Sequence, residues 1–127
     1  MMHDPFLVLV VDDTENVREL IRVNLALEGF DVRVACDGQE ALDLVAELGP
    51  DLITMDVVMP NLDGLAAVTR LKMDPVTSGI PIVMVTARAQ TADRDKGRRA
   101  GADAYITKPF EPRELVETVR RLLDARR

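Results

Sequence analysis

The sequence is poor in the residues on which several kinds of site depend. It contains a single cysteine, Cys36, a single histidine and no tryptophan, and only 3% of its residues are aromatic. One cysteine cannot form an internal disulfide, and without a cluster of cysteines or histidines a zinc site is not expected. We predict that Cys36 is a small buried hydrophobic residue, as free cysteines usually are.

An excess of basic residues and long apolar segments are also absent. The chain carries a formal charge of −6, so no overall positive charge attracts it to nucleic acid phosphates or to an anionic membrane. No segment approaches the roughly 18 apolar residues of a membrane span, and residues 1–5 lack the basic region of a signal peptide. We therefore expect a cytoplasmic protein with no direct contact to nucleic acid and no membrane insertion.

The length and composition are those of one folded domain. The chain has 127 residues, of which 47% are hydrophobic and 30% are charged, and both fractions are ordinary for a globular protein. A chain of this length buries a substantial core.

Short apolar runs alternate with amphipathic stretches along the whole chain. The runs are rich in Val, Ile and Leu, which is typical of parallel strands covered on both faces, and they span residues 6–11, 31–35, 51–55, 80–85 and 103–107. Apolar residues at helical spacing predict five helices between and after them, within residues 17–25, 41–48, 65–71, 89–100 and 112–123.

For two of these helices the sequence also predicts which residues are buried or how tightly the helix packs. The first is expected to bury Val17, Leu20, Ile21 and Leu25 and to stop near Gly29. The fourth, within residues 89–100, offers its neighbours mainly alanines, so we expect it to be the most weakly packed helix.

Alternation of this kind predicts an α/β fold with a doubly wound, five-stranded parallel sheet between two layers of helices. In such sheets ligands bind outside the carboxyl ends of the strands. The residues that end the strands are therefore the candidates for a functional site.

Polar side chains follow four of the five strands. Asp12 and Asp13 follow the first, Asp56 the third, Thr86 the fourth and Lys108 the fifth. Three carboxylates so close together repel each other by roughly 4 kcal/mol per pair at 4 Å and an effective dielectric near 20, which one lysine does not offset. Mg²⁺, which prefers carboxylate and water oxygens, does offset it, so the pattern predicts a magnesium site.

This arrangement also predicts a reaction. With Mg²⁺ held by Asp12 and Asp13, Asp56 has an oxygen free to attack phosphorus and form an acyl phosphate. Lys108 and the hydroxyl of Thr86 are then placed to hold the phosphoryl oxygens. A simpler interpretation is that Asp12 and Asp13 cap the first helix beside Thr14 while Lys108 pairs with an aspartate.

Four motifs resemble those of one known family over essentially the whole chain. They are VVDD (10–13), DVVMPNLDG (56–64), TA (86–87) and YITKPF (105–110). Because the four motifs occur in this order and at this spacing, the sequence resembles the receiver domain of bacterial two-component response regulators. Residues 1–127 are accordingly predicted to form one receiver domain, similar to the single-domain regulators of chemotaxis.

The resemblance implies a flavodoxin-like fold with strand order 2-1-3-4-5 and five helices. It implies that Asp56 receives a phosphoryl group from a histidine kinase or a histidine phosphotransfer protein. Asp12, Asp13, Asp56 and the backbone carbonyl of Val58 are then the implied ligands of Mg²⁺. Lys108 is expected on the phosphoryl group, and family members often hold the following peptide bond to Pro109 in the cis form.

The resemblance also implies a switch. Thr86 moves to the phosphoryl group, Tyr105 turns inward, and the fourth helix, fifth strand and fifth helix form the surface that changes. This surface would act on a downstream protein target or on a fused output domain. Such a protein is a phosphoacceptor that assists its own phosphorylation and dephosphorylation, rather than an enzyme.

Other functions remain open at the level of the sequence. The same fold could be a receiver-like interaction module that is never phosphorylated. A Mg²⁺-dependent phosphohydrolase is a weaker alternative, because haloacid dehalogenase-like enzymes need a second aspartate where this chain has Val58. A flavodoxin-like cofactor binder is disfavoured because Asp12 and Asp13 would repel a phosphate.

Overall fold

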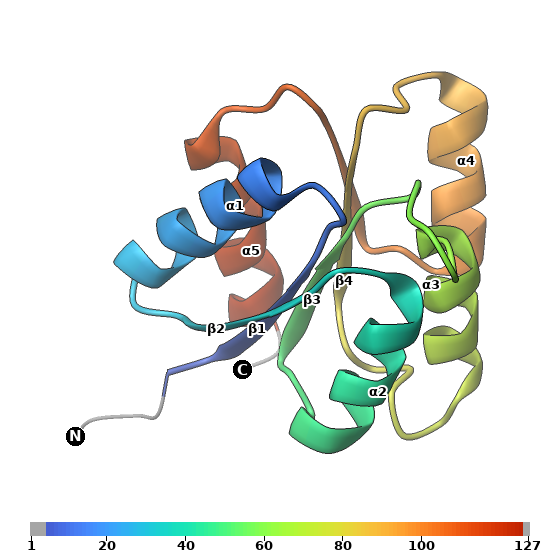
Figure 1. Ribbon diagram of the computed structural model, residues 1–127, viewed down its shortest axis with the longest axis horizontal. Coiled ribbons are helices and arrows are strands. Elements are labelled where there is room, and N and C mark those ends of the chain that lie inside the picture. The colour runs from blue at the N-terminus through green and yellow to red at the C-terminus, as the bar shows by residue number, and fades with distance from the viewer. Residues whose placement is uncertain (1–4, 126–127) are drawn as a thin grey trace.

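Helices and strands alternate strictly along the chain (Figure 1). The computed structural model describes residues 5–125, and within them the strands are β1 (Leu7–Val11), β2 (Asp31–Ala35), β3 (Leu52–Met55), β4 (Ile82–Thr86) and β5 (Ala104–Thr107). The helices are α1 (Glu15–Leu27), α2 (Gly38–Leu48), α3 (Gly64–Met73), α4 (Thr91–Ala100) and α5 (Pro112–Asp124). No helix of this described part is long and apolar enough to cross a membrane.

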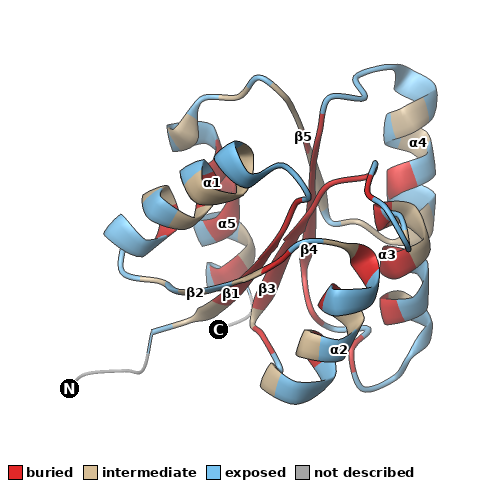
Figure 2. Cartoon of the chain, in the orientation of Figure 1, coloured by how far each residue is buried: buried red, intermediate tan, exposed pale blue. Residues whose placement is uncertain are grey.

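The five strands form one parallel sheet in the order β2-β1-β3-β4-β5, as predicted. Every residue of β3 and β4 is buried, because both strands are central and are covered on both faces (Figure 2). In β2, at the edge, only Ala35 is buried. The strand order reverses between β1 and β3, which is where sheets of this type bind ligands.

Two layers of helices cover the sheet. Helices α1 and α5 lie on one face, and α2, α3 and α4 lie on the other (Figure 1). Each of the two interfaces between the sheet and a helix layer has its own apolar core, because successive side chains of a strand point to opposite faces of the sheet. Leu9, Ile53 and Met84 point to the α2 and α3 side, whereas Val10 and Val83 point to the α1 and α5 side.

Helix ends follow the signals in the sequence. Helix α1 gives way to Gly29, which has a φ of 95° and so occupies the left-handed region that glycine tolerates. Helix α5 begins with Pro112 in its first turn, where a missing N–H costs nothing. In α4 Gly97 is the only buried residue, which confirms the prediction that this helix is weakly packed.

Two predictions about burial are wrong. Leu20 is 44% exposed, because α1 turns Ile21 and Leu25 toward the sheet and leaves Leu20 at the margin of that stripe. Cys36 is exposed; it follows β2, which is an edge strand of the sheet.

Candidate functional site

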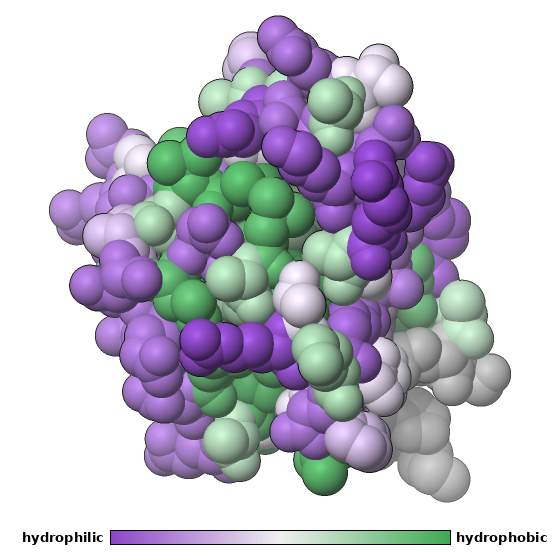
Figure 3. Space-filling model, turned by 90° about the vertical axis from the view of Figure 1, so that its right-hand side faces the viewer, coloured by the Kyte–Doolittle hydropathy of each residue, from purple (hydrophilic) through white to green (hydrophobic). Residues whose placement is uncertain are grey.

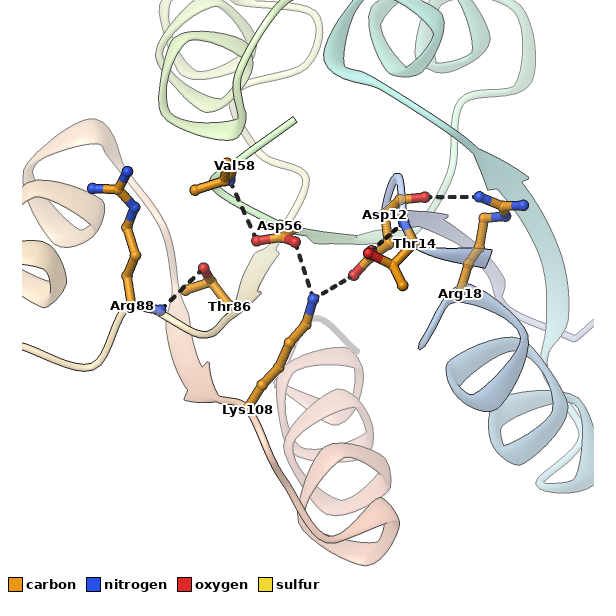
Figure 4. A network of polar contacts seen from close by, with 8 residues as sticks. All are labelled: Asp12, Thr14, Arg18, Asp56, Val58, Thr86, Arg88 and Lys108. Atoms are coloured by element: carbon orange, nitrogen blue, oxygen red, sulfur yellow. Dashed lines mark hydrogen bonds and ion pairs between the residues drawn. The ribbon is translucent and has the colours of Figure 1, made fainter. Parts of the chain in front are cut away.

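The strand register brings the predicted site residues to one place. Val11 of β1 pairs with Met55 of β3, so the residues that follow them, Asp12 and Asp56, emerge side by side. At the other side of β3, Thr86 of β4 pairs with Thr107 of β5, which places Lys108 beside the end of β4. Figure 4 shows these side chains converging at the carboxyl edge of the sheet.

Lys108 bridges two of the three carboxylates. Its Nζ donates to Oδ2 of Asp12 at 2.8 Å and to Oδ2 of Asp56 at 3.0 Å. Burial alone would lower the pKa of Lys108, but the hydrogen bonds to Asp12 and Asp56 and the negative charges of these residues together outweigh burial and raise the pKa above its ordinary value. The peptide bond between Lys108 and Pro109 is cis, as the resemblance implied.

The three aspartates are arranged as a metal site requires. Asp12, Asp13 and Asp56 each offer a carboxylate oxygen, and these oxygens lie within 4.8 Å of one another. Asp12 and Asp56 are buried, whereas Asp13 is exposed, so water has access to one side of the cluster. An all-oxygen cluster open to water on one side fits Mg²⁺, which keeps part of its hydration shell.

The simpler interpretation of this cluster is correct only in part. Oδ1 of Asp12 does accept a hydrogen bond from the backbone N–H of Thr14 at 2.9 Å, and Lys108 does pair with aspartates. Neither contact involves Asp13, and the side chain of Thr14 does not cap α1. One lysine therefore faces three clustered carboxylates, which leaves a charge for a cation to balance.

Arg18 also supports the site, and the sequence analysis did not identify it. Its Nη1 donates to the backbone carbonyl of Asp12 at 3.0 Å, which holds the turn between β1 and α1 (Figure 4). The sequence indicates this role only through the position of Arg18, one turn into α1. Charged residues are common at such positions, so the position alone does not identify a site residue.

The segment between Asp56 and α3 is tightly constrained. A side chain at Gly64 would overlap the backbone carbonyl of Asp56, so only glycine lets α3 begin this close to Asp56. The N–H of Gly64 donates to the carbonyl of Val57 at 2.8 Å, and the carboxylate of Asp63 caps α3 by accepting from the N–H of Ala66. Val58 lies at the mouth of the site, with its N–H 3.4 Å from Oδ1 of Asp56.

The side chains of Thr86 and Tyr105 both contact the backbone of Arg88. The hydroxyl of Tyr105 donates to the carbonyl of Arg88 at 2.8 Å, and Oγ1 of Thr86 lies 3.4 Å from the N–H of Arg88. Thr86 is buried, and the ring of Tyr105 is half-buried against Gly97 of α4. Burial, and then the negative charge of Asp93, raise the pKa of Tyr105.

Comparison with known proteins identifies the family. The model of the response regulator receiver domain family matches residues 8–120. The chain belongs to this family. It is a receiver domain of two-component response regulators, and domains of this kind are signalling modules that bind Mg²⁺ in an acidic pocket.

Curated relatives and solved structures agree with this assignment. The receiver domain is 46% identical over 113 residues to the DNA-binding response regulator MtrA of Mycolicibacterium paratuberculosis, covering 89% of this chain and 49% of the relative. It is 40% identical to the DNA-binding dual master transcriptional regulator RpaA of Synechocystis sp., covering 91% of this chain and 48% of the relative. The chain thus spans about half the length of these relatives.

Two solved structures have nearly the same fold as this receiver domain. The Francisella response regulator 1452 receiver domain has a TM-score of 0.91 at 33% identity, and the match covers 96% of this chain and 99% of that one. The chemotaxis protein CheY4 of Vibrio cholerae has a TM-score of 0.88 at 32% identity, with 93% and 98% covered. These structures confirm the flavodoxin-like fold and the five-stranded order predicted from the sequence.

Proposed function

We propose that Asp56 is the residue of this receiver domain that accepts a phosphoryl group. The observation that supports the proposal is the position of its carboxylate. One oxygen is held by Nζ of Lys108 at 3.0 Å, and the carboxylate lies in a cluster with Asp12 and Asp13 at the open edge of the sheet. A carboxylate so placed can attack a phosphorus atom that enters from solvent.

The donor proposed is a phosphohistidine on a histidine kinase or a histidine phosphotransfer protein. An oxygen of Asp56 forms a bond to phosphorus while the bond between phosphorus and the imidazole nitrogen breaks, and the imidazole leaves with that electron pair. Lys108 then holds a phosphoryl oxygen from one side and the hydroxyl of Thr86 holds another. The acyl phosphate is hydrolysed when water attacks phosphorus: the bond between phosphorus and the Asp56 oxygen breaks, inorganic phosphate leaves and the carboxylate is restored, in a reaction that the same residues assist.

Asp12, Asp13, Asp56 and the backbone carbonyl of Val58 are the residues that would hold Mg²⁺. When bound, this ion would neutralise the charge that develops on the phosphoryl oxygens during transfer. The residues fit the ion, because the cluster supplies only oxygen ligands and has one exposed member.

Phosphorylation is proposed to act on the rest of the domain through Thr86 and Tyr105. Both side chains adjoin the backbone of Arg88, so a movement of Thr86 toward a phosphoryl group disturbs the segment to which Tyr105 is bonded. The surface of α4, β5 and α5 would change with it. We propose that this surface acts in the cytoplasm on a downstream protein or on an output domain joined to the receiver.

Intact mass spectrometry after incubation with acetyl phosphate and Mg²⁺ tests the acceptor. We expect the mass of one phosphoryl group to be added, and we expect its addition to be abolished by Asp56→Asn and by chelation of Mg²⁺. Asp43→Asn is the matched control, because Asp43 is an exposed carboxylate on α2 outside the cluster. An unchanged mass would support the non-phosphorylated interaction module instead, and repeated release of phosphate from a simple ester would support the phosphohydrolase.

A pull-down with phosphorylated and unmodified protein tests the output. We expect a partner that binds the phosphorylated form more tightly, and we expect Tyr105→Ala to weaken this difference. Equal capture of the two forms would contradict a switch that depends on Tyr105.

A further inference from the structure

The face formed by α2, α3 and α4 carries opposite charges on its two sides. Every charged residue of α2 is acidic and exposed, namely Glu40, Asp43 and Glu47. Helix α4, at the other side, exposes Lys96 and Arg99, and neither forms an ion pair within residues 5–125. The acidic residues of α4, Asp93 and Asp95, already pair with Arg88 and Arg98.

Grooves on either side of α3 have the same polarity as the adjoining helices. The groove between α2 and α3 has a volume of about 560 Å³ and includes Asp37, Glu40 and Asp43, and among residues 5–125 Arg70 is the one cation that lines it. The groove between α3 and α4 has a volume of about 330 Å³, and its charged residues are Lys96 and Arg99. The face is therefore acidic along one groove and basic along the other.

An uncharged row runs along α3 and forms the α3 side of the basic groove. Leu65, Thr69 and Met73 follow one another at intervals of four residues, so they lie along one side of α3. Met73 is 78% exposed, and Leu65 and Thr69 line the groove beside α4. Figure 3 looks onto the side of the molecule where α3 and α4 lie, and hydrophobic side chains there are surrounded by hydrophilic ones.

We propose that this face binds a second copy of the same chain about a two-fold axis that runs along α3. Rotation by half a turn about such an axis brings the acidic α2 of one copy opposite the basic α4 of the other. The second α2 and α4 pair in the same way, because a two-fold interface uses each contact twice. The uncharged row of α3 then meets its own symmetry mate at the centre.

The distribution of charge favours a second copy over other occupants. A nucleic acid would find cations along α4 but would be repelled by the carboxylates of α2 across the same face. A uniformly acidic protein would meet the same repulsion. A partner must carry both signs at the same spacing, and the chain itself does so. This inference does not depend on the phosphorylation of Asp56.

Salt should control the association. At 0.1 M ionic strength the Debye length is about 10 Å, so the net charges of the two copies are largely screened while facing charge pairs a few ångströms apart are not. At 1 M the length falls to about 3 Å and the facing pairs are screened as well. The dissociation constant of the dimer is therefore expected to rise between these conditions.

Analytical ultracentrifugation over a range of protein concentrations tests the proposal. We expect the wild type to form dimers reversibly at 0.1 M salt, and we expect Lys96→Glu with Arg99→Glu to raise the dissociation constant by about tenfold or more. The control is Arg113→Glu with Arg121→Glu on α5, which makes the same change in net charge on the opposite face of the sheet. This control variant should dimerise like the wild type.

A mixing experiment guards against misfolded variants. Asp43→Lys with Glu47→Lys reverses the charge of α2, and this variant alone should be monomeric. Mixed with the Lys96→Glu and Arg99→Glu variant, it should restore dimers, because each reversed helix then faces an opposite charge. A wild type that stays monomeric would overturn the proposal and would leave Lys96 and Arg99 to a different partner. Equal dimerisation of all variants, or no dimers in the mixture, would also overturn it.

Discussion

Asp56 illustrates how a single residue combines burial with a position at the open edge of the sheet. It follows a strand whose four residues are all buried, and it is itself buried. An unpaired carboxylate there would be costly. Lys108 compensates this charge from one side, while the exposed position of Asp13 leaves the other side of the site open to solvent.

Tyr105 should titrate at an unusually high pH. It is the only tyrosine and the chain has no tryptophan, so an ultraviolet absorbance titration reports this phenol alone. Burial and the charge of Asp93 both disfavour the phenolate, so we expect a midpoint above the ordinary value of 10.0. A raised pKa means that the stability contributed by the neutral phenol is present below pH 10 and is lost as the pH rises through the folded-state pKa.

Variants of the neighbouring charges check the cause of this shift. Asp93→Asn should lower the midpoint of Tyr105 toward 10.0, whereas removal of Arg94, which lies 5.3 Å over the ring, should raise it further. A wild-type midpoint at or below 10.0 would contradict the half-buried position of the ring.

Among the elements, α4 differs from the other helices in how little it buries. Its single buried residue is a glycine, which lowers helix stability by about 1 kcal/mol relative to alanine. Gly97 has a steric reason to be there, because a Cβ at this position would lie 3.0 Å from the ring of Tyr105. The position of the ring thus depends on the absence of a side chain in α4.

A double-mutant cycle measures this dependence. In a Tyr105→Ala background, Gly97→Ala should stabilise the domain by about 1 kcal/mol through helix propensity alone. In the wild-type background the same change should gain less or should destabilise, because the new methyl group displaces the ring and weakens its hydrogen bond to Arg88. Urea denaturation of the four proteins gives the coupling energy, and equal effects in both backgrounds would show that the ring does not rest on Gly97.

At the level of elements, the sequence predicted all five strands and all five helices because their apolar patterns are strong. The strand ends were predicted within two residues, and the signals at Gly29 and Pro112 marked helix ends correctly. Leu20 and Cys36 were misplaced because their exposure depends on which neighbours cover them, and periodicity does not report tertiary cover. The support of the Asp12 turn by Arg18 was missed for a similar reason, since it depends on how α1 leaves the sheet.

The whole molecule concentrates its unfavourable charge at one end of a rigid sheet. Two apolar cores hold β1 and β3 in register, so Asp12 and Asp56 cannot move apart to relieve their repulsion. Folding of the metal-free domain must bring these carboxylates together. A ligand that binds only the folded state repays this cost in proportion to its occupancy.

Mg²⁺ should therefore stabilise the domain, and Asp13→Asn should reverse the order of stabilities. At 100 times its dissociation constant, Mg²⁺ is expected to add about 2.7 kcal/mol to the free energy of unfolding of the wild type. With chelator present, Asp13→Asn should be more stable than the wild type by about 1 kcal/mol, the repulsion of two charges about 4 Å apart in water. The variant should gain little from Mg²⁺, so the wild type becomes the more stable protein once the ion is added.

Urea denaturation followed by circular dichroism, with and without Mg²⁺, measures both effects. Asp124→Asn removes an exposed carboxylate of α5, outside both the cluster and the proposed dimer face, and should follow the wild type in both conditions. If Asp13→Asn gained as much from Mg²⁺ as the wild type, Asp13 would not be a ligand. If it were less stable than the wild type with chelator present, the three carboxylates would not repel one another in the folded domain, and the charge argument for a bound cation would fail.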